Sequence, residues 1–549
     1  MTLSRHASPA WRSATRHRAF AAIVATLAVT SLTACLGGRG GAQVAQPGGS
    51  YDLLIRNGRV LDGSGNPWIR ADIAIRDGRI AAIGRLAGVT ATRTIDAADR
   101  YVAPGFIDAH SHAASGLARP ELSQGQPLLA QGVTTIVANP DGGGPLDLAG
   151  QRATLEGQGI GVNVALLIGH NTVRTAVLGA DERAPTDAEL EEMQALVRQG
   201  MEDGAFGLSS GLFYAPGSYA ATEEVIALAR IAGEHGGLYT SHIRDEGNYS
   251  AGGLLAAVDE VIRIAEEGRL TGVVTHMKAL GPGSWGLSVA ATTHIDTARR
   301  RGIAVFADQY PYEASSTGLS AALVPRWAHE GGDAALVARI EDPEVRARML
   351  PEVTENLARR GGPASIVVAR YEPDPSLEGQ TLEDIAEARG AMPEDAALEL
   401  IAAGSVSIVS FNMSEADIEH IMRQPYTMTS SDGGLVAMGE GRPHPRNNGA
   451  FARKIARYVN ERGTIGLEFA VRATTSLPAS VFRMNDRGVI REGAWADIVV
   501  FDPAAVRDTA SYTDPHRLAE GMSFVLVNGT VVVDEGRFTD ARPGRVLRR

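Results

Sequence analysis

The strongest constraint on the fold is an alternation of short apolar segments, each ending in polar residues, with longer helical patterns. Eight short segments span residues 101–112, 132–139, 162–170, 205–210, 238–242, 273–278, 304–310 and 427–432. Helical periodicity lies between them, as in residues 187–204, 221–235 and 252–267. Eight βα units predict an α/β protein built on a parallel (β/α)8, or TIM, barrel, in which the active site lies at the C-terminal ends of the strands.

Both ends of the chain show a different pattern of strands and tight turns. Residues 52–58 and 71–78 predict strands that run into Asn-Gly and Asp-Gly turns, and residues 496–503 and 523–529 repeat this arrangement near the C-terminus. We therefore expect residues 51–103 and 480–549 to form one small β-sandwich from both chain ends. Residues 104–479 are then left for the barrel.

One connection is far longer than a barrel needs. Residues 318–425 separate the seventh and eighth predicted strands and are rich in helix-forming residues. This length predicts an inserted helical subdomain or lid.

The N-terminus has the order of a targeting segment. Basic residues lie between positions 5 and 18, small and apolar residues follow, and Leu32-Thr-Ala-Cys35 closes the segment. This ending resembles the bacterial lipobox, whose cysteine is lipidated and becomes the first mature residue. We expect a lipoprotein signal peptide over residues 1–34 and a flexible glycine-rich tether over residues 35–50. The alternative is an ordinary secretory signal with a chance cysteine.

A lipidated Cys35 would anchor an exported protein to a bacterial membrane, facing the periplasm or the outside. Leu36 is not acidic, which by the same resemblance favours the outer membrane. Cys35 is the only cysteine, so its lipidation would leave no thiol for a disulfide or a metal. The net charge of −12 argues against nucleic acid as a partner.

Four histidines and one aspartate end the predicted barrel strands. His110 and His112 follow the first strand two positions apart, a spacing that places both side chains on one face of a strand. His242 ends the fifth strand, His276 the sixth and Asp432 the eighth. Each histidine alone is more often structural, but together they predict a zinc site at the barrel mouth, because neutral imidazole is a standard zinc ligand.

This set of groups is what amide hydrolysis requires. Zinc lowers the pKa of a bound water to about 7 and polarises a carbonyl group. Asp432 could bind the metal, accept a proton from the attacking water and return it to the leaving amine. Lys278, Tyr310 and Arg446 also follow barrel strands and could hold a substrate carboxylate, the alternative for each being a solvated loop residue.

Several ordered segments resemble the D-aminoacylase (N-acyl-D-amino-acid deacylase) family of the amidohydrolase superfamily. The resemblance covers nearly all of residues 52–549 and is carried by residues 104–112, 169–174, 207–217, 241–246, 310–312, 431–433, 443–446 and 542–549. It implies a distorted TIM barrel with a small β-sandwich and zinc-dependent cleavage of linear N-acyl-D-amino acids to a D-amino acid and a carboxylate. It also implies metal or catalytic roles for His110, His112, His242, His276 and Asp432, and contacts of Lys278, Tyr310 and Arg446 with the substrate carboxylate.

The chain departs from that family at one metal ligand. The family places a cysteine after the second strand in an Asn-Cys-Gly context, whereas residues 137–144 read Val-Ala-Asn-Pro-Asp-Gly-Gly-Gly. We take Asp141 as the replacement ligand and Asn139 as the weaker candidate, with one or two zinc ions bound. Three alternatives stay open: a dipeptidase for L-Xaa-D-Xaa dipeptides, a cyclic-amide hydrolase, and an inactive lipid-anchored binding protein.

Overall fold

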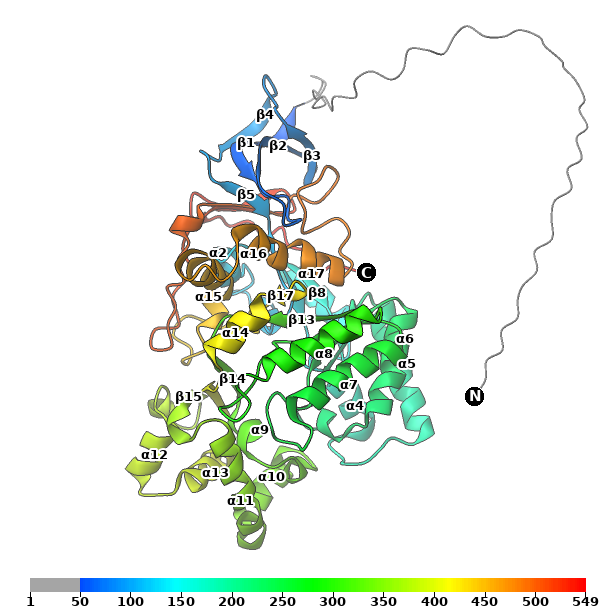
Figure 1. The fold of residues 1–549 in the computed structure, drawn as a ribbon, viewed down its shortest axis with the longest axis vertical. Helices are drawn as coiled ribbons and strands as arrows, with labels where there is room; N and C mark the ends of the chain where they lie inside the picture. The colour runs from blue at the N-terminus through cyan, green and yellow to red at the C-terminus, as the bar shows by residue number, and fades with distance from the viewer. Residues whose placement is uncertain (1–49) are drawn as a thin grey trace, which may run out of the picture. The chain divides into compact units, whose positions relative to one another are not determined.

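Parallel strands form the centre of the protein, whose computed structural model describes residues 50–549 (Figure 1). The predicted signal peptide, Cys35 and nearly all of the tether lie outside the described residues. The parallel strands are β6 (Phe106–Asp108), β7 (Val133–Ala138), β8 (Asn163–Leu166), β9 (Ile168–Gly169), β10 (Gly207–Gly211), β11 (Leu238–His242), β12 (Thr271–Val274), β13 (Val305–Gln309) and β17 (Thr427–Thr429).

These strands surround a shared interior in the order in which they occur along the chain. β8 and β9 form one extended segment interrupted at Leu167; β8 pairs with β7, and β9 pairs with β10. At the other edge, the Ala109 N–H donates to the Thr429 carbonyl at 3.3 Å, and the Asp432 N–H donates to the His110 carbonyl at 2.9 Å. The distorted TIM barrel predicted from the sequence is confirmed.

Amphipathic helices cover the outside of the barrel. The predicted helical patterns correspond to α5 (Asp187–Glu202), α6 (Thr222–Glu234) and α7 (Gly253–Gly268), followed by α8 (Ser288–Arg300). α5 begins at a capping box, in which the Thr186 and Glu189 side chains each accept from the other's backbone N–H. The remaining helices of this layer are α1 (Ala114–Leu117), α2 (Gln126–Ala130), α3 (Leu148–Gln158), α4 (His170–Leu178), α14 (Glu415–Met422), α15 (Arg446–Arg453), the π-helix η5 (Lys454–Glu461), α16 (Leu467–Thr474) and α17 (Ser476–Val481).

Strands from both chain ends join in one nine-stranded sheet, labelled in the upper part of Figure 1 where it is blue. Its order is β21-β20-β19-β18-β5-β1-β2-β3, with β4 beside β1. The Ile80 N–H of β3 also bonds the Ala494 carbonyl just before β18, so the sheet curls back on itself. The bounds are β1 (Tyr51–Val60), β2 (Ile69–Arg76), β3 (Arg79–Gly84), β4 (Ala91–Asp96), β5 (Tyr101–Pro104), β18 (Ile498–Phe501), β19 (Met522–Val527), β20 (Thr530–Asp534) and β21 (Arg537–Phe538).

Two of the three predicted tight turns are confirmed. Asp77-Gly78 joins β2 to β3, and Asn528-Gly529 joins β19 to β20. The prediction of a turn at Asn57-Gly58 is wrong, because β1 continues through it with an irregularity between Ile55 and Gly58. Asn57 has a φ of 58°, and a Cβ on Gly58 would lie 2.5 Å from the Val102 side chain. The pair therefore forms a bulge, which a side chain at the glycine would disrupt.

The first predicted strand is divided between the two sheets. Residues 101–112 were expected to form one strand, but β5 pairs with β18 in the terminal sheet and β6 pairs with β7 in the barrel. The break falls at Gly105, where a Cβ would lie 2.2 Å from the Thr134 hydroxyl oxygen. Since β6 ends at Asp108, His110 and His112 lie beyond it in a loop.

The insertion between β13 and β17 is only partly helical. It contains α9 (Leu319–Leu323), α10 (Asp333–Glu341), α11 (Pro343–Arg359), α12 (Leu382–Arg389) and α13 (Pro393–Ala403), which gather in the lower part of Figure 1. It also contains a three-stranded antiparallel sheet that was not predicted. This sheet has the order β14 (Ala314–Gly318), β16 (Val406–Phe411), β15 (Ile366–Tyr371).

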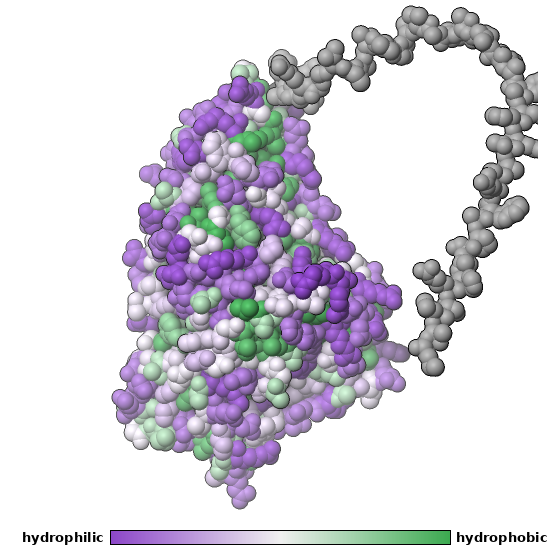
Figure 2. Space-filling view, viewed as in Figure 1, coloured by the Kyte–Doolittle hydropathy of each residue, from purple (hydrophilic) through white to green (hydrophobic). Residues whose placement is uncertain are grey.

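Polar residues cover most of the face shown in Figure 2, with small apolar patches between them. Exposed large apolar side chains include Trp68, Ile69, Trp285 and Val289. Within residues 50–549, every helix is too short or too polar to cross a membrane.

Candidate metal centre

Six side chains that could bind metal converge beyond the C-terminal ends of the barrel strands. His110 and His112 follow β6, Asp141 follows β7, His242 is the last residue of β11, His276 follows β12 and Asp432 follows β17. Asp141, His276 and Asp432 have positive φ values of 56°, 35° and 50°. Such backbone conformations are costly for residues other than glycine and often occur at functional sites.

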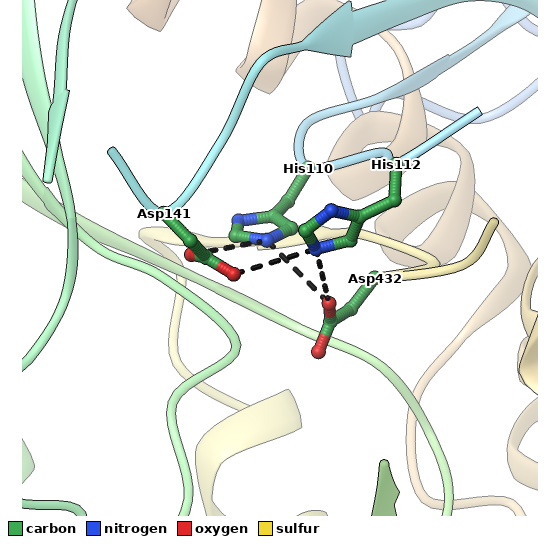
Figure 3. Close-up of side chains that lie close together, drawn as sticks. All are labelled: His110, His112, Asp141 and Asp432. Atoms are coloured by element: carbon green, nitrogen blue, oxygen red, sulfur yellow. Dashed lines mark ion pairs between the residues drawn. The ribbon is translucent and has the colours of Figure 1, made fainter. Parts of the chain in front are cut away.

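Four of these side chains form a first group of donors (Figure 3). His110 Nε2 lies 3.4 Å from Asp141 Oδ1 and 3.5 Å from Asp432 Oδ1. His112 Nε2 lies 3.3 Å from Asp141 Oδ2 and 3.2 Å from Asp432 Oδ1. The two carboxylates therefore face the same pair of imidazole nitrogens.

A second group of donors shares Asp141 with the first. It consists of Asp141, His242 and His276. His276 Nε2 lies 3.5 Å from Asp141 Oδ1, and His242 Nδ1 lies 3.9 Å from Asp141 Oδ2. Both oxygens of Asp141 thus lie between the two groups. This is the arrangement of a carboxylate that could bridge two metal ions.

The spacing of these atoms fits ligands of a common ion. Two donors about 2.1 Å from one tetrahedral zinc ion lie about 3.4 Å apart. The separations of 3.2–3.5 Å in the first group agree with this value. In addition, His110 Nε2, Asp141 Oδ1 and both ring nitrogens of His242 are buried and lack a hydrogen-bond partner. Buried polar atoms without partners are rare, and a cation would satisfy these.

Asn139, the weaker candidate, points elsewhere. Its amide group exchanges hydrogen bonds with Gln151 at 2.8 and 3.0 Å and donates to the Leu167 carbonyl at 3.2 Å. Between the two candidates for the missing cysteine, the geometry therefore favours Asp141.

The electrostatics keep the two aspartates ionised. Burial alone would raise their pKa values, but the imidazoles around Asp141 and the Arg446 guanidinium beside Asp432 hold both pKa values well below the usual range. Burial and Lys278 lower the pKa of His276, but Asp432 and Glu246 outweigh them and raise it to about 10. The centre thus has enough negative charge to favour a bound cation.

Glu246 is a site residue to which the sequence analysis gave no role. It is buried, and its Oε1 lies 2.9 Å from His276 Nδ1 and in direct contact with Lys278 Nζ. Lys278 Nζ also lies 2.8 Å from His276 Nδ1. A metal bound at His276 Nε2 would require the tautomer in which Nδ1–H donates to Glu246. The signal in the sequence was the position of Glu246 four residues after His242.

The three predicted substrate-binding residues line one cavity together with Asp432. Arg446 Nη1 is 2.7 Å from Asp432 Oδ2, and its guanidinium lies 4.6 Å from the centre of the Tyr310 ring. Lys278 Nζ lies 5.6 Å from the same ring. The Tyr310 hydroxyl is buried without a partner, so it is free to donate to a bound group.

A cavity of about 570 Å³ connects these residues with the insertion. Its walls include His112, Asp141, His242 and Asp432 from the centre, and Ser316, Arg360 and Arg370 from the insertion. A volume of this size is typical of a small-molecule site.

Comparison with known proteins identifies the family. The model of the amidohydrolase family matches residues 93–533. The chain belongs to the amidohydrolase family. An N-acyl-D-glutamate deacylase and a D-aminoacylase, both from Alcaligenes xylosoxydans xylosoxydans, are 37% and 36% identical to it; each alignment covers 91% of this chain, and 96% and 98% of the respective relative.

A solved structure shows the same similarity in three dimensions. The N-acyl-D-glutamate deacylase of Bordetella bronchiseptica, solved with zinc and a phosphonate inhibitor, is 36% identical and has a TM-score of 0.78, over 91% of this chain and 100% of that one. The predicted membership of the D-aminoacylase family within the amidohydrolases is confirmed. The chain is accordingly a hydrolase of that family, with a cluster of histidines and aspartates where the fold places its active site.

Proposed function

We propose that the protein is a zinc-dependent deacylase that hydrolyses N-acyl-D-amino acids to a D-amino acid and a carboxylate. The main support is the pair of donor groups that share Asp141, next to the cluster of Arg446, Tyr310 and Lys278 in one cavity. The relatives named above act on N-acyl-D-amino acids by name, and the Bordetella enzyme was solved with zinc. No observation favours the dipeptidase, cyclic-amide hydrolase or inactive binding protein considered from the sequence.

The proposed ligands are His110, His112, Asp141 and Asp432 in one group, and Asp141, His242 and His276 in the other. Zinc bound there would polarise the scissile carbonyl and activate a water molecule. The fold holds these carboxylates and imidazoles in place before the substrate arrives, so little reorganisation is needed during the reaction.

Asp432 is the proposed general base and acid. Its Oδ1 faces His110 and His112, whereas its Oδ2 pairs with Arg446 at 2.7 Å. A substrate carboxylate that binds Arg446 competes for this ion pair. Asp432 Oδ2 would then be free to accept the proton of the attacking water and to pass it to the leaving amine.

Lys278, Tyr310 and Arg446 are the proposed anchors of the substrate α-carboxylate. Arg446 can bind it with two parallel hydrogen bonds, and the unpaired Tyr310 hydroxyl can donate a further one. This anchoring would hold the scissile amide close to Asp432.

The test is amine release from matched N-acetyl-D- and N-acetyl-L-amino acids by the purified protein, before and after chelation and with zinc restored. Asp432→Asn is the variant to compare, because it keeps the shape of the side chain and removes the base. We expect D-selective release that depends on zinc and falls at least about hundredfold in the variant. Equal release from both enantiomers, or release by the thoroughly chelated protein, would contradict the proposal.

We further propose that the mature protein is exported and anchored to a membrane through lipid on Cys35, with the outer membrane favoured. The Leu-Thr-Ala-Cys segment after a basic and then apolar stretch supports this. Metabolic labelling with a palmitate analogue tests it, with Cys35→Ala as the control. Label in the variant, or none in the wild type, would refute the anchor.

A further inference from the structure

One buried arginine in the cavity lacks an acidic partner. Arg360 follows the last residue of α11 and lines the cavity, and only 2% of it is exposed. Its Nε donates to the Tyr249 hydroxyl at 2.8 Å, while its Nη1 is buried with no hydrogen-bond partner. Among residues 50–549, no carboxylate forms an ion pair with it.

Neighbouring arginines show that this is unusual. Arg370, also in the cavity wall, pairs with Glu440 at 2.6 Å and Glu372 at 2.8 Å. Arg359, next to Arg360 in the chain, pairs with Glu355. A buried charge without a partner is costly, because it loses hydration and gains no ion pair. A ligand that supplies an acidic group to Arg360 would remove this cost.

Arg360 lies apart from the proposed anchors of the α-carboxylate. The ring centres of His242 and Phe213 lie 5.7 Å apart, and those of Phe213 and Tyr249 lie 5.2 Å apart. The Tyr249 hydroxyl in turn accepts the hydrogen bond from Arg360. Two aromatic rings thus separate Arg360 from the metal centre. The cavity therefore offers two separate positions for negative charge.

We propose that the preferred substrates carry a second carboxylate, and that Arg360 binds it. This inference rests on the proposed deacylase function and specifies its substrate class. The second carboxylate could belong to the side chain of the D-amino acid or to the far end of the acyl group. Both present the same chemistry to Arg360, so the experiment must separate them.

Two matched pairs of substrates do this. N-acetyl-D-glutamate against N-acetyl-D-glutamine tests the side chain, and N-succinyl-D-leucine against its terminal amide tests the acyl group. In one of these two substrate pairs, we expect the kcat/KM for the acid to be about ten- to hundredfold higher than the kcat/KM for its amide. This is the range for hydrogen bonds to a charged group. Arg360→Met should remove this preference by lowering the kcat/KM on the acid to that on its amide.

Arg359→Met is the matched control, since Arg359 is adjacent but does not line the cavity, and it should keep the preference. Arg360→Lys retains the charge and should keep part of the acid preference. It takes the place of Arg360→Met if the methionine variant fails to fold. A wild type that hydrolyses both amides as fast as their acids would overturn the inference and leave the deacylase function intact. An acid preference that persists in Arg360→Met would overturn the role of Arg360. No turnover of any N-acyl-D substrate would overturn the proposed function itself.

Discussion

Replacing Asp141 with alanine should remove one metal ion and leave the other. The carboxylate supplies an oxygen to both donor groups, but the groups differ in what stays behind. Without it, the first group keeps His110, His112 and Asp432, whereas the second keeps only His242 and His276. Catalytic zinc sites usually have three protein ligands, so only the first group still meets that number. We expect affinity at the second group to fall at least about hundredfold, since changes beyond the direct ligands already cost ten- to hundredfold.

The measurement is metal content by mass spectrometry after dialysis against graded chelator. The zinc content of Asp141→Ala should fall by one equivalent, while Asp141→Cys should retain it because a thiolate again binds at that position. Asn139→Ala is the control, because the Asn139 amide bonds Gln151 and the Leu167 carbonyl instead of facing the centre. Loss of both ions together from Asp141→Ala, or of neither, would refute the inference that Asp141 bridges the two groups.

Three further predictions concern buried charges. Arg446→Lys keeps the charge beside Asp432 but cannot form two parallel hydrogen bonds, so KM should rise about tenfold or more at unchanged metal content; an unaltered KM would contradict the anchoring role. Arg174→Met leaves the buried Glu224 without its guanidinium partner and should lower the free energy of unfolding by about 3–5 kcal/mol in urea titrations, and a change below about 1 kcal/mol would show that the pair matters little. Burial lowers the pKa of Lys454 from 10.5 to about 7, so the unfolded state binds more protons between these values and the free energy of unfolding should rise with pH across this window. Lys454→Met should flatten that rise, and an equal slope in both proteins would exclude Lys454 as its source.

The sequence predicted which residues converge better than it predicted how. His110 and His112 were expected to share a face of one strand, but β6 ends at Asp108. They reach the same place because the loop is held against the residues after β17: the His112 N–H donates to the Gly433 carbonyl at 2.9 Å. Alternation along a strand cannot reveal such a contact, because it depends on two segments far apart in the chain.

The sequence indicated three other features, β15, Glu246 and Arg360, to different degrees. The Ile366-Val-Val-Ala-Arg-Tyr371 segment is rich in β-branched residues and could have predicted β15, but the helix-forming residues around it favoured a helical interpretation. Glu246 lies within residues 241–246, which carry the family resemblance, but its contacts with His276 and Lys278 become visible only in the fold. Arg360 had no signal at all among fifty arginines, because whether an arginine is paired is decided only by the fold.

The terminal sheet affects the order in which the protein can fold. β1 and β5 come from the beginning of the described chain, yet β5 pairs with β18, close to its end. The core of this sheet likewise combines Leu53, Ile55 and Val102 with Ile498, Phe524 and Leu526. Contacts so distant in sequence slow folding, because a long loop must close before they form. During synthesis, β5 therefore keeps an unpaired edge until β18 has been made.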